Sequence, residues 1–152
     1  NAEKIIQHFV NHNNIHISLI VSNKNNAGVL DIAKRSGIET LILEKKKFME
    51  SNDYVQYFKN QGITHIVLAG FLLKVPDSLI HNYNNKILNI HPALLPAYGG
   101  KGMYGSRIHD KVIENNETET GITIHYVSEQ YDSGEIIFQR KKQVSSCIDP
   151  RS

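Results

Sequence analysis

The chain has 152 residues, of which 40% are hydrophobic and 21% charged, and this length and composition suit one globular domain rather than a disordered segment. Its 17 Lys and Arg residues against 15 Asp and Glu leave a net charge of +2, which gives no strong field to attract nucleic acid. The single cysteine, Cys147, excludes an internal disulfide. Because no apolar run reaches the ~20 residues that cross a bilayer and residues 1–14 lack a signal-peptide pattern, we expect a cytoplasmic protein without a membrane partner.

Hydrophobic periodicity and turn residues predict helices that alternate with strands along most of the chain. In chain order the expected elements are a helix over 2–12, a strand over 15–21, a helix over 28–36, a strand over 40–43, a helix over 48–60, a strand over 63–69, a helix over 76–83, a strand over 87–91, a helix over 106–115, and a pair of strands over 121–127 and 135–144. Strands separated by helices need crossover connections, which favour parallel pairing. We therefore expect an α/β fold with three layers, in which helices cover both faces of a mostly parallel, twisted sheet.

Both ends of the sequence depart from that pattern. A βαβ fold opens on a strand, yet this chain begins on a helix with Asn1 in the N-cap position, and it stops at Ser152, where a further helix could start. We expect one domain over 1–152 that lacks its first strand and last helix. Ligands of such sheets bind beyond the carboxyl ends of the strands, so the loops after Ala69, His91 and Val127 are the candidate site.

The segment over 89–96, Asn-Ile-His-Pro-Ala-Leu-Leu-Pro, carries the strongest chemical signal. Residues two apart on a strand share a face, so Asn89 and His91 project together while Ile90 points into the core. An amide donor beside an imidazolium can stabilise a developing oxyanion and deliver a proton. The alternative is structural: Asn89 ends the strand and His91 packs under a loop stiffened by two prolines. The segment alone leaves both interpretations open.

Two further polar residues fall near the same edge. Asp132 follows the strand over 121–127 on a connecting loop, and a carboxylate near His91 would stabilise the imidazolium and fix its tautomer. Asp-Ser-Gly is also ordinary turn sequence, which is the competing explanation. His125 shares a strand face with Thr123 and, taken alone, is typical of a buried structural histidine.

Other motifs predict less. Gly70 opens an apolar loop that suits a flat heteroaromatic ligand or simply packs on the next helix. Residues 100–105 match G-x-G-x-x-G, but residues 92–99 separate them from the preceding strand, so we expect a flexible loop beside the site and no dinucleotide fingerprint. His8 and His12 are four residues apart but have no third ligand, and we predict no metal site.

Three segments in this order resemble the phosphoribosylglycinamide formyltransferase family: Asn89-Ile-His91-Pro-Ala-Leu-Leu-Pro, Gly121-Ile-Thr-Ile-His125-Tyr-Val, and Asp132-Ser-Gly134-Glu-Ile-Ile-Phe-Gln. The resemblance covers essentially the whole chain and implies a Rossmann-like formyltransferase fold. It implies transfer of the formyl group from the co-substrate 10-formyltetrahydrofolate to the amine of glycinamide ribonucleotide, a step of de novo purine biosynthesis, by direct attack without a metal. The family's catalytic Asn, His and Asp carry over to Asn89, His91 and Asp132.

The resemblance also assigns binding residues. The ribonucleotide would lie across Gly70, Asn89 and Pro92 and contact His125. Its phosphate would lie at the amino end of the first helix, where Asn1 remains of the family's phosphate loop. The folate would contact Asn89 and two loops: Leu72, Leu73, Lys74 and Val75 in the first, and Ser128, Glu129, Gln130, Tyr131 and Asp132 in the second.

Alternative functions stay open. Formyltetrahydrofolate deformylase is similar in this domain and uses the same residue types to direct water at the formyl group, although Pro92 directly after His91 favours the transferase. Methionyl-tRNA formyltransferase usually lacks a counterpart of His125 and adds a basic carboxyl-terminal domain. A folate- or nucleotide-binding module without catalysis is the alternative from another class. The sequence predicts neither the oligomeric state nor the order of substrate binding.

Overall fold

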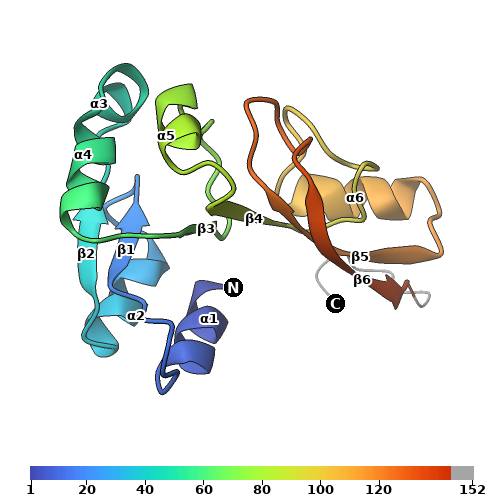
Figure 1. Ribbon diagram of the computed structural model, residues 1–152. Helices are drawn as coiled ribbons and strands as arrows, with labels where there is room; N and C mark the ends of the chain where they lie inside the picture. The colour runs from blue at the N-terminus through green and yellow to red at the C-terminus, as the bar shows by residue number, and fades with distance from the viewer. Residues whose placement is uncertain (145–152) are drawn as a thin grey trace. The chain divides into compact units, whose positions relative to one another are not determined.

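The structure is a computed structural model that describes residues 1–144, and it divides the chain into two compact units, Asn1–Ile63 and Thr64–Ser152 (Figure 1). The first unit holds α1 (Ala2–Phe9), β1 (Leu19–Ser22), α2 (Gly28–Arg35), β2 (Glu39–Ile42), α3 (Lys45–Glu50) and α4 (Asp53–Asn60). The second holds β3 (Ile66–Leu68), α5 (Asp77–Asn82), β4 (Ile87–His91), α6 (Ser106–Glu114), β5 (Glu119–Tyr126) and β6 (Ile136–Gln143). Helices and strands alternate as the sequence predicts.

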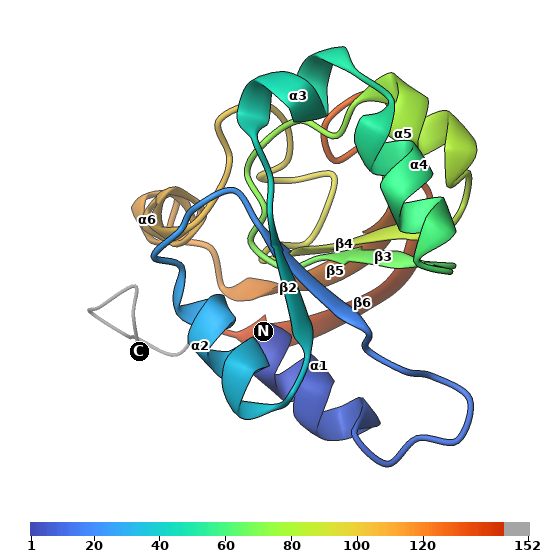
Figure 2. The same ribbon diagram turned by 90° about the vertical axis from the view of Figure 1, so that its left-hand side faces the viewer.

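A parallel strand pair and its crossover helix form the centre of the first unit. β1 and β2 lie side by side in register from Leu19–Glu39 to Ser22–Ile42, and α2 connects them (Figure 2). Gly37 ends this helix as predicted, because its φ of +66° suits glycine and lets the amide of Ile38 donate back to the carbonyl of Ala33.

Three predicted elements of this unit differ from the expectation: one helix is divided, another ends earlier, and one strand begins later. The single helix predicted over 48–60 is two helices, because the Ser51 hydroxyl donates to the carbonyl of Lys47 and accepts from the amide of Asp53, which ends α3 and starts α4. His12 ends the turn after α1 in a similar way, since its Nδ1 accepts the amides of Asn14 and Ile15, each at 3.1 Å. α1 therefore ends at Phe9, and β1 begins at Leu19.

The second unit contains a four-stranded sheet in the order β3-β4-β5-β6. β3 and β4 are parallel and joined through α5, whereas β4 pairs with β5, and β5 with β6, in antiparallel fashion. The final two strands are thus the predicted pair. With the parallel pairs at β1–β2 and β3–β4, the predicted α/β class is confirmed.

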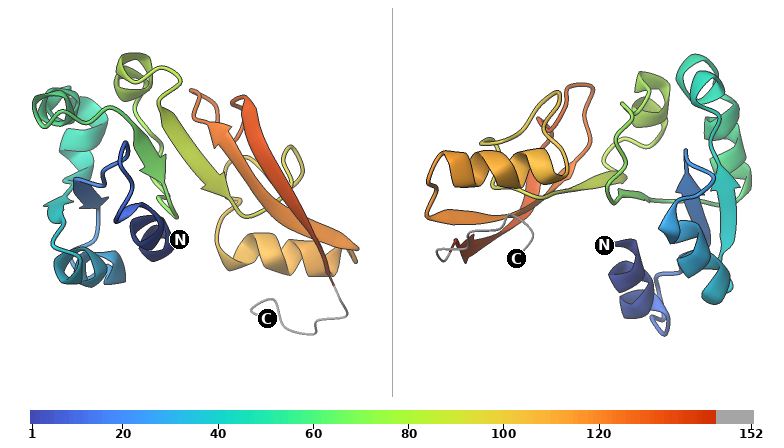
Figure 3. Two further views of the ribbon diagram at one scale, coloured as in Figure 1. Left: turned by 60° about the horizontal axis from the view of Figure 1, so that its bottom comes forward. Right: turned by 180° about the vertical axis from the view of Figure 1, so that it is seen from behind.

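α6 lies along one face of this sheet (Figure 3) and anchors the long loop that follows β4. Ile108 and Val112, four residues apart, are buried against Ala93 of that loop, and Tyr98 and Met103 pack around them. This core therefore holds the loop after β4 near its start, at Ala93, and near its end, at Met103. No helix within residues 1–144 is long and apolar enough to span a membrane.

Candidate functional site

Two rows of paired residues place the candidate side chains at one end of the β4–β5 pair. Asn89 lies opposite His125, and His91 lies opposite Thr123. Because residues two apart share a strand face, the polar side chains of both strands are on the same side of the sheet. His91 is 3% exposed and His125 is 2% exposed, so both rings are removed from water.

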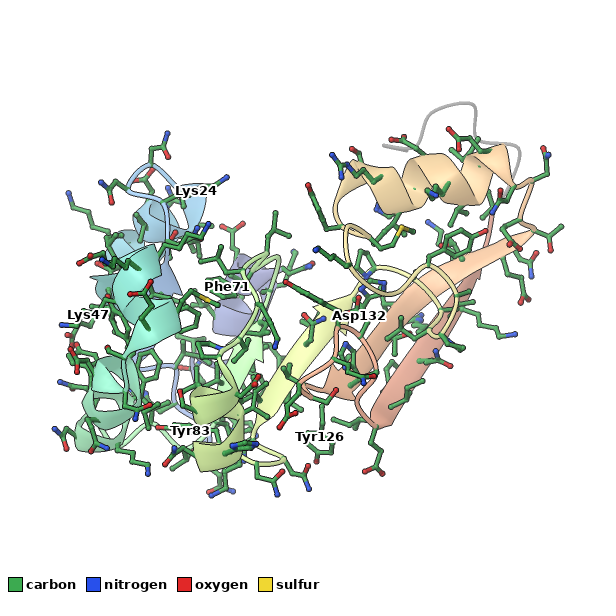
Figure 4. The ribbon with its side chains drawn as sticks, turned by 90° about the horizontal axis from the view of Figure 1, so that it is seen from above. Lys24, Lys47, Phe71, Tyr83, Tyr126 and Asp132 are labelled. Atoms are coloured by element: carbon green, nitrogen blue, oxygen red, sulfur yellow. The ribbon has the colours of Figure 1, made fainter. Side chains whose placement is uncertain are left out.

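Asp132 joins these side chains from the loop between β5 and β6 (Figure 4). Its Oδ1 lies 3.4 Å from Asn89 Nδ2, 3.5 Å from His91 Nδ1 and 3.6 Å from His125 Nε2. Its Oδ2 accepts the amide of Gly100 at 2.9 Å. The structure therefore brings Asn89, His91 and Asp132 together, as the shared strand face and the loop position predict.

The pKa of Asp132 reflects opposing effects. Burial by itself would raise the pKa of this carboxyl group, but the His125 ring and the amide of Gly100 stabilise the carboxylate, and attraction to His91 adds to them. Together they outweigh burial and hold the pKa of Asp132 below its ordinary value. The site thus contains a carboxylate that stays charged at neutral pH.

Both ring nitrogens of His91 face acceptors. Nε2 donates to the carbonyl oxygen of Tyr98 at 2.8 Å, since a carbonyl cannot donate, and Nδ1 faces the Asp132 carboxylate. A doubly protonated ring satisfies both neighbours. The arrangement therefore suits an imidazolium held in one orientation beside a negative charge.

The His125 ring has a different role in the hydrogen-bond pattern. Its Nδ1 lies 2.8 Å from the carbonyl oxygen of Tyr126 and must donate to it. In the neutral ring Nε2 then accepts from Asn89 Nδ2 at 3.1 Å, whereas in the protonated ring Nε2 can donate to Asp132 at 3.6 Å and stabilise the carboxylate. The neutral His125 ring therefore turns the NH₂ group of Asn89, rather than its carbonyl, toward Asp132.

Backbone groups of the loop after β4 complete the site, and sequence analysis did not predict them. The carbonyl of Tyr98 holds His91, and the amide of Gly100 holds Asp132. Every residue carries the same backbone groups, so residue type gives no signal for these contacts. The adjacent Gly99 does carry a signal in the sequence, because a larger residue there would crowd its neighbours. A Cβ at Gly99 would lie 2.6 Å from Leu95 Cδ2 and 3.3 Å from Asp132 Cβ.

The residues predicted to bind folate occupy two loops of the second unit. In the first, Leu72 is exposed, Val75 is buried, and Lys74 pairs with Asp77 at 3.2 Å. In the second, the hydroxyl of Ser128 donates to the carbonyl of Gln130, and Glu129 lies 2.8 Å from His81. A ligand contact for Leu72, Leu73, Lys74, Val75, Ser128, Glu129, Gln130 and Tyr131 stays a prediction.

The residues predicted to bind the ribonucleotide lie in both units. Gly70 follows β3 with a φ of +75°, and Pro92 follows β4 half-buried. Asn1 precedes α1 as predicted, although its side chain makes no capping hydrogen bond. Their ligand contacts stay predictions. Residues 1–144 contain no group of three or more His, Cys, Asp and Glu side chains that could hold a metal ion.

A half-buried Asn and two buried His on neighbouring strands of an α/β fold, together with a charged Asp on the following loop, define a site suited to acyl-group chemistry. The chain belongs to the formyl transferase family, whose model matches residues 1–149. It is 39% identical over 139 residues to the chloroplastic phosphoribosylglycinamide formyltransferase of Arabidopsis thaliana, covering 88% of this chain and 48% of the relative. It is 35% identical over 129 residues to the phosphoribosylglycinamide formyltransferase of Haemophilus influenzae, covering 82% and 58%.

The crystal structure of phosphoribosylglycinamide formyltransferase from Bacillus halodurans superposes with a TM-score of 0.82 at 30% identity, over 99% of this chain and 76% of that one. A formyltetrahydrofolate deformylase from Pseudomonas syringae reaches a TM-score of 0.80 at 20% identity, which shows a shared fold alone. The chain spans about half the length of the curated relatives it matches. The predicted cytoplasmic location stays a prediction.

Proposed function

We propose that the protein transfers the formyl group of 10-formyltetrahydrofolate to the amine of glycinamide ribonucleotide. The similarity to proteins named phosphoribosylglycinamide formyltransferase supports this reaction over others of the family. The observation that carries the proposal is the convergence of Asn89, His91 and His125 on one carboxylate oxygen of Asp132, at 3.4, 3.5 and 3.6 Å.

The reaction begins when the amine nitrogen attacks the formyl carbon. A carbon–nitrogen bond forms, and the formyl oxygen takes up negative charge. The NH₂ group of Asn89 and the Nδ1–H of His91 make only long contacts with Asp132 in the structure, at 3.4 and 3.5 Å, so each can donate to the formyl oxygen instead. The burial of His91 strengthens these hydrogen bonds. Because only the charged oxygen accepts these bonds strongly, they lower the barrier more than they tighten substrate binding.

The second half of the reaction cleaves the bond between the formyl carbon and the folate nitrogen. The attacking amine must lose a proton, and the departing folate nitrogen must gain one. Asp132 lies 3.5 Å from His91 Nδ1 and holds the ring in place, and it relays this proton through water. Loss of one oxyanion donor from such a site raises the barrier by about 3 to 4 kcal/mol.

We assign small-molecule partners to the loops around this centre. The exposed side chain of Leu72 and the loop over 128–132 suit the flat pteridine ring, whose polar edge backbone groups can read. Gly70, Pro92 and His125 would contact the ribonucleotide, and Asn1 its phosphate. The proposal includes no metal and no nucleic acid.

Folate release measured with and without glycinamide ribonucleotide tests this function. The full-length protein is incubated with 10-formyltetrahydrofolate, and tetrahydrofolate is followed over time. We expect release that depends on the ribonucleotide and a formylated ribonucleotide in equal amount. Release that ignores the ribonucleotide would identify a deformylase, and no release from folded protein would identify a binding module. Either result contradicts the proposal.

A further inference from the structure

One row of residues crosses three strands of the second unit and links the candidate site to the edge of the sheet. His91 on β4 lies opposite Thr123 on β5, and Thr123 lies opposite Gln139 on β6. The ring of His91 belongs to the candidate site, whereas the proposed reaction gives no role to Thr123 or Gln139. Thr123 is a buried polar residue with 0% exposure, so its hydroxyl group needs partners within the protein.

The Thr123 hydroxyl uses all of its hydrogen-bonding capacity on the loop after β4 and on β6. It donates to the carbonyl of Ala93 at 2.6 Å. It accepts the amide of Leu95 at 3.0 Å and the side-chain Nε2 of Gln139 at 2.9 Å. A hydroxyl has one proton and two lone pairs, and each of them is engaged here.

Gln139 closes the same network from the opposite side. Its Nε2 donates to the carbonyl of Leu95 at 2.9 Å as well as to Thr123. Both groups of the Leu95 backbone are therefore satisfied by these two side chains. Three hydrogen bonds with these side chains fix the main chain at Ala93 and Leu95 to β5 and β6, and a fourth links the two side chains to each other.

The fixed segment leads directly into the groups that hold the candidate catalytic residues. Tyr98, three residues after Leu95, accepts the hydrogen bond of His91, and Gly100 donates to Asp132. A shift of the segment at Ala93 and Leu95 would move the Tyr98 carbonyl and the Gly100 amide with it. The ring of His91 and the carboxylate of Asp132 would then lose their orientation.

We propose that Thr123 and Gln139 are positioning residues that hold the loop from Ala93 to Gly100 and thereby fix His91 and Asp132 for catalysis. Neither side chain touches the reacting atoms. The effect on turnover rests on the proposed formyl transfer, whereas the effect on the His91 ring does not.

Two substitutions that each remove one hydrogen-bonding group, together with matched controls, test the kinetic effect in the full-length protein. Thr123→Val keeps the shape but removes the hydroxyl, and Gln139→Leu removes the amide. We expect kcat to fall by about 10- to 100-fold with KM nearly unchanged, because small displacements of catalytic groups have effects of this size. Thr123→Ser keeps the three hydrogen bonds and should restore most of the rate.

Gln143→Leu and Thr120→Val serve as controls on the same strands. Gln143 is an exposed residue of β6 whose amide donates to Glu119, so its deletion removes a similar hydrogen bond away from the site. Both controls should keep the rate of the unmodified protein. A loss of rate in Gln143→Leu as large as in Gln139→Leu would overturn the proposal, and so would a full rate in Thr123→Val.

The His91 ring gives a readout that does not depend on activity. Long-range ¹H–¹⁵N spectra of the imidazole report the Nε2 proton that Tyr98 accepts. We expect the Nε2 signals of His91 to shift in Thr123→Val and Gln139→Leu but not in Gln143→Leu. Unchanged His91 signals in both Thr123→Val and Gln139→Leu would refute the positioning role, whether or not formyl transfer is the reaction. Shifted signals in a protein without that activity would support the positioning role and reject the proposed function.

Discussion

Asp132 combines a turn conformation with a charge at the candidate site. Its φ of +53° lies in the left-handed region, which Asp tolerates better than most residues do. The same residue accepts the amide of Gly100 and lies beside two histidines. Asp-Ser-Gly can therefore be turn sequence and part of the candidate site at once, because Asp132 both adopts the turn conformation and supplies the carboxylate.

The lowered pKa of Asp132 predicts how stability depends on pH. A carboxyl group with a lower pKa in the folded protein binds fewer protons there than in the unfolded chain, so it adds stability above its ordinary pKa. That contribution is lost as the pH falls through the folded pKa. We expect Asp132→Asn to show a shallower loss of unfolding free energy in acid than the unmodified protein. Denaturant titrations across this acidic range measure the slopes, and equal slopes would contradict the prediction.

At the scale of elements, α6 and the loop before it form the support of the site. Ile108 has 0% exposure, and it packs with Val112 against Ala93, next to the segment that Thr123 holds. The helix thus stabilises the loop from one side, while β5 and β6 fix it from the other.

Ile108→Ala tests that support. Removal of a buried Ile side chain costs about 2 to 5 kcal/mol, since the neighbours close the cavity only in part. Ile137→Ala on β6 is the control, because this side chain is 47% exposed and its loss should cost less than about 0.5 kcal/mol. Unfolding followed by circular dichroism gives both values. Similar costs for the two variants would show that α6 contributes no core at Ile108.

The sequence predicted the type and order of these elements better than their ends. Periodicity found α6 and β4 with errors of at most one residue, because their apolar positions repeat clearly. It missed the break between α3 and α4, where a Ser51 hydroxyl replaces helical hydrogen bonds within a continuous apolar stripe. A side chain that bonds to the backbone in this way does not change the hydrophobic periodicity, so the sequence pattern does not reveal the break.

At the scale of the whole molecule, the candidate site is concentrated in one compact unit. Asn89, His91, His125 and Asp132 all belong to the unit Thr64–Ser152, and the contacts that join them involve no residue of the other unit. The family model nevertheless matches residues 1–149, so both units are part of the formyl transferase domain. Asn1, the residue proposed to bind phosphate, belongs to the first unit.

The sequence indicated which side chains gather at the site but not how they are held. Strand alternation placed Asn89 and His91 on one face, and the resemblance added Asp132. The carbonyl of Tyr98, the amide of Gly100 and the network of Thr123 and Gln139 required the structure, because they depend on strand register and on the path of the loop. Ligand contacts in the loops over 72–75 and 128–132 stay predictions.

The central claim is that Asn89, His91 and Asp132 act together on one carbonyl group, and turnover compared with ligand binding in three variants tests it most directly. In the full-length protein, Asn89→Ala and His91→Ala should each lower kcat by about 10²- to 10³-fold, as loss of an oxyanion donor does. Asp132→Asn, which removes the carboxylate beside His91, should also lower kcat strongly. The dissociation constant of a folate analogue that cannot transfer its formyl group should change far less than kcat does. His8→Ala, which replaces an exposed histidine of α1, should keep full activity. Near-normal turnover in both His91→Ala and Asp132→Asn would contradict the claim.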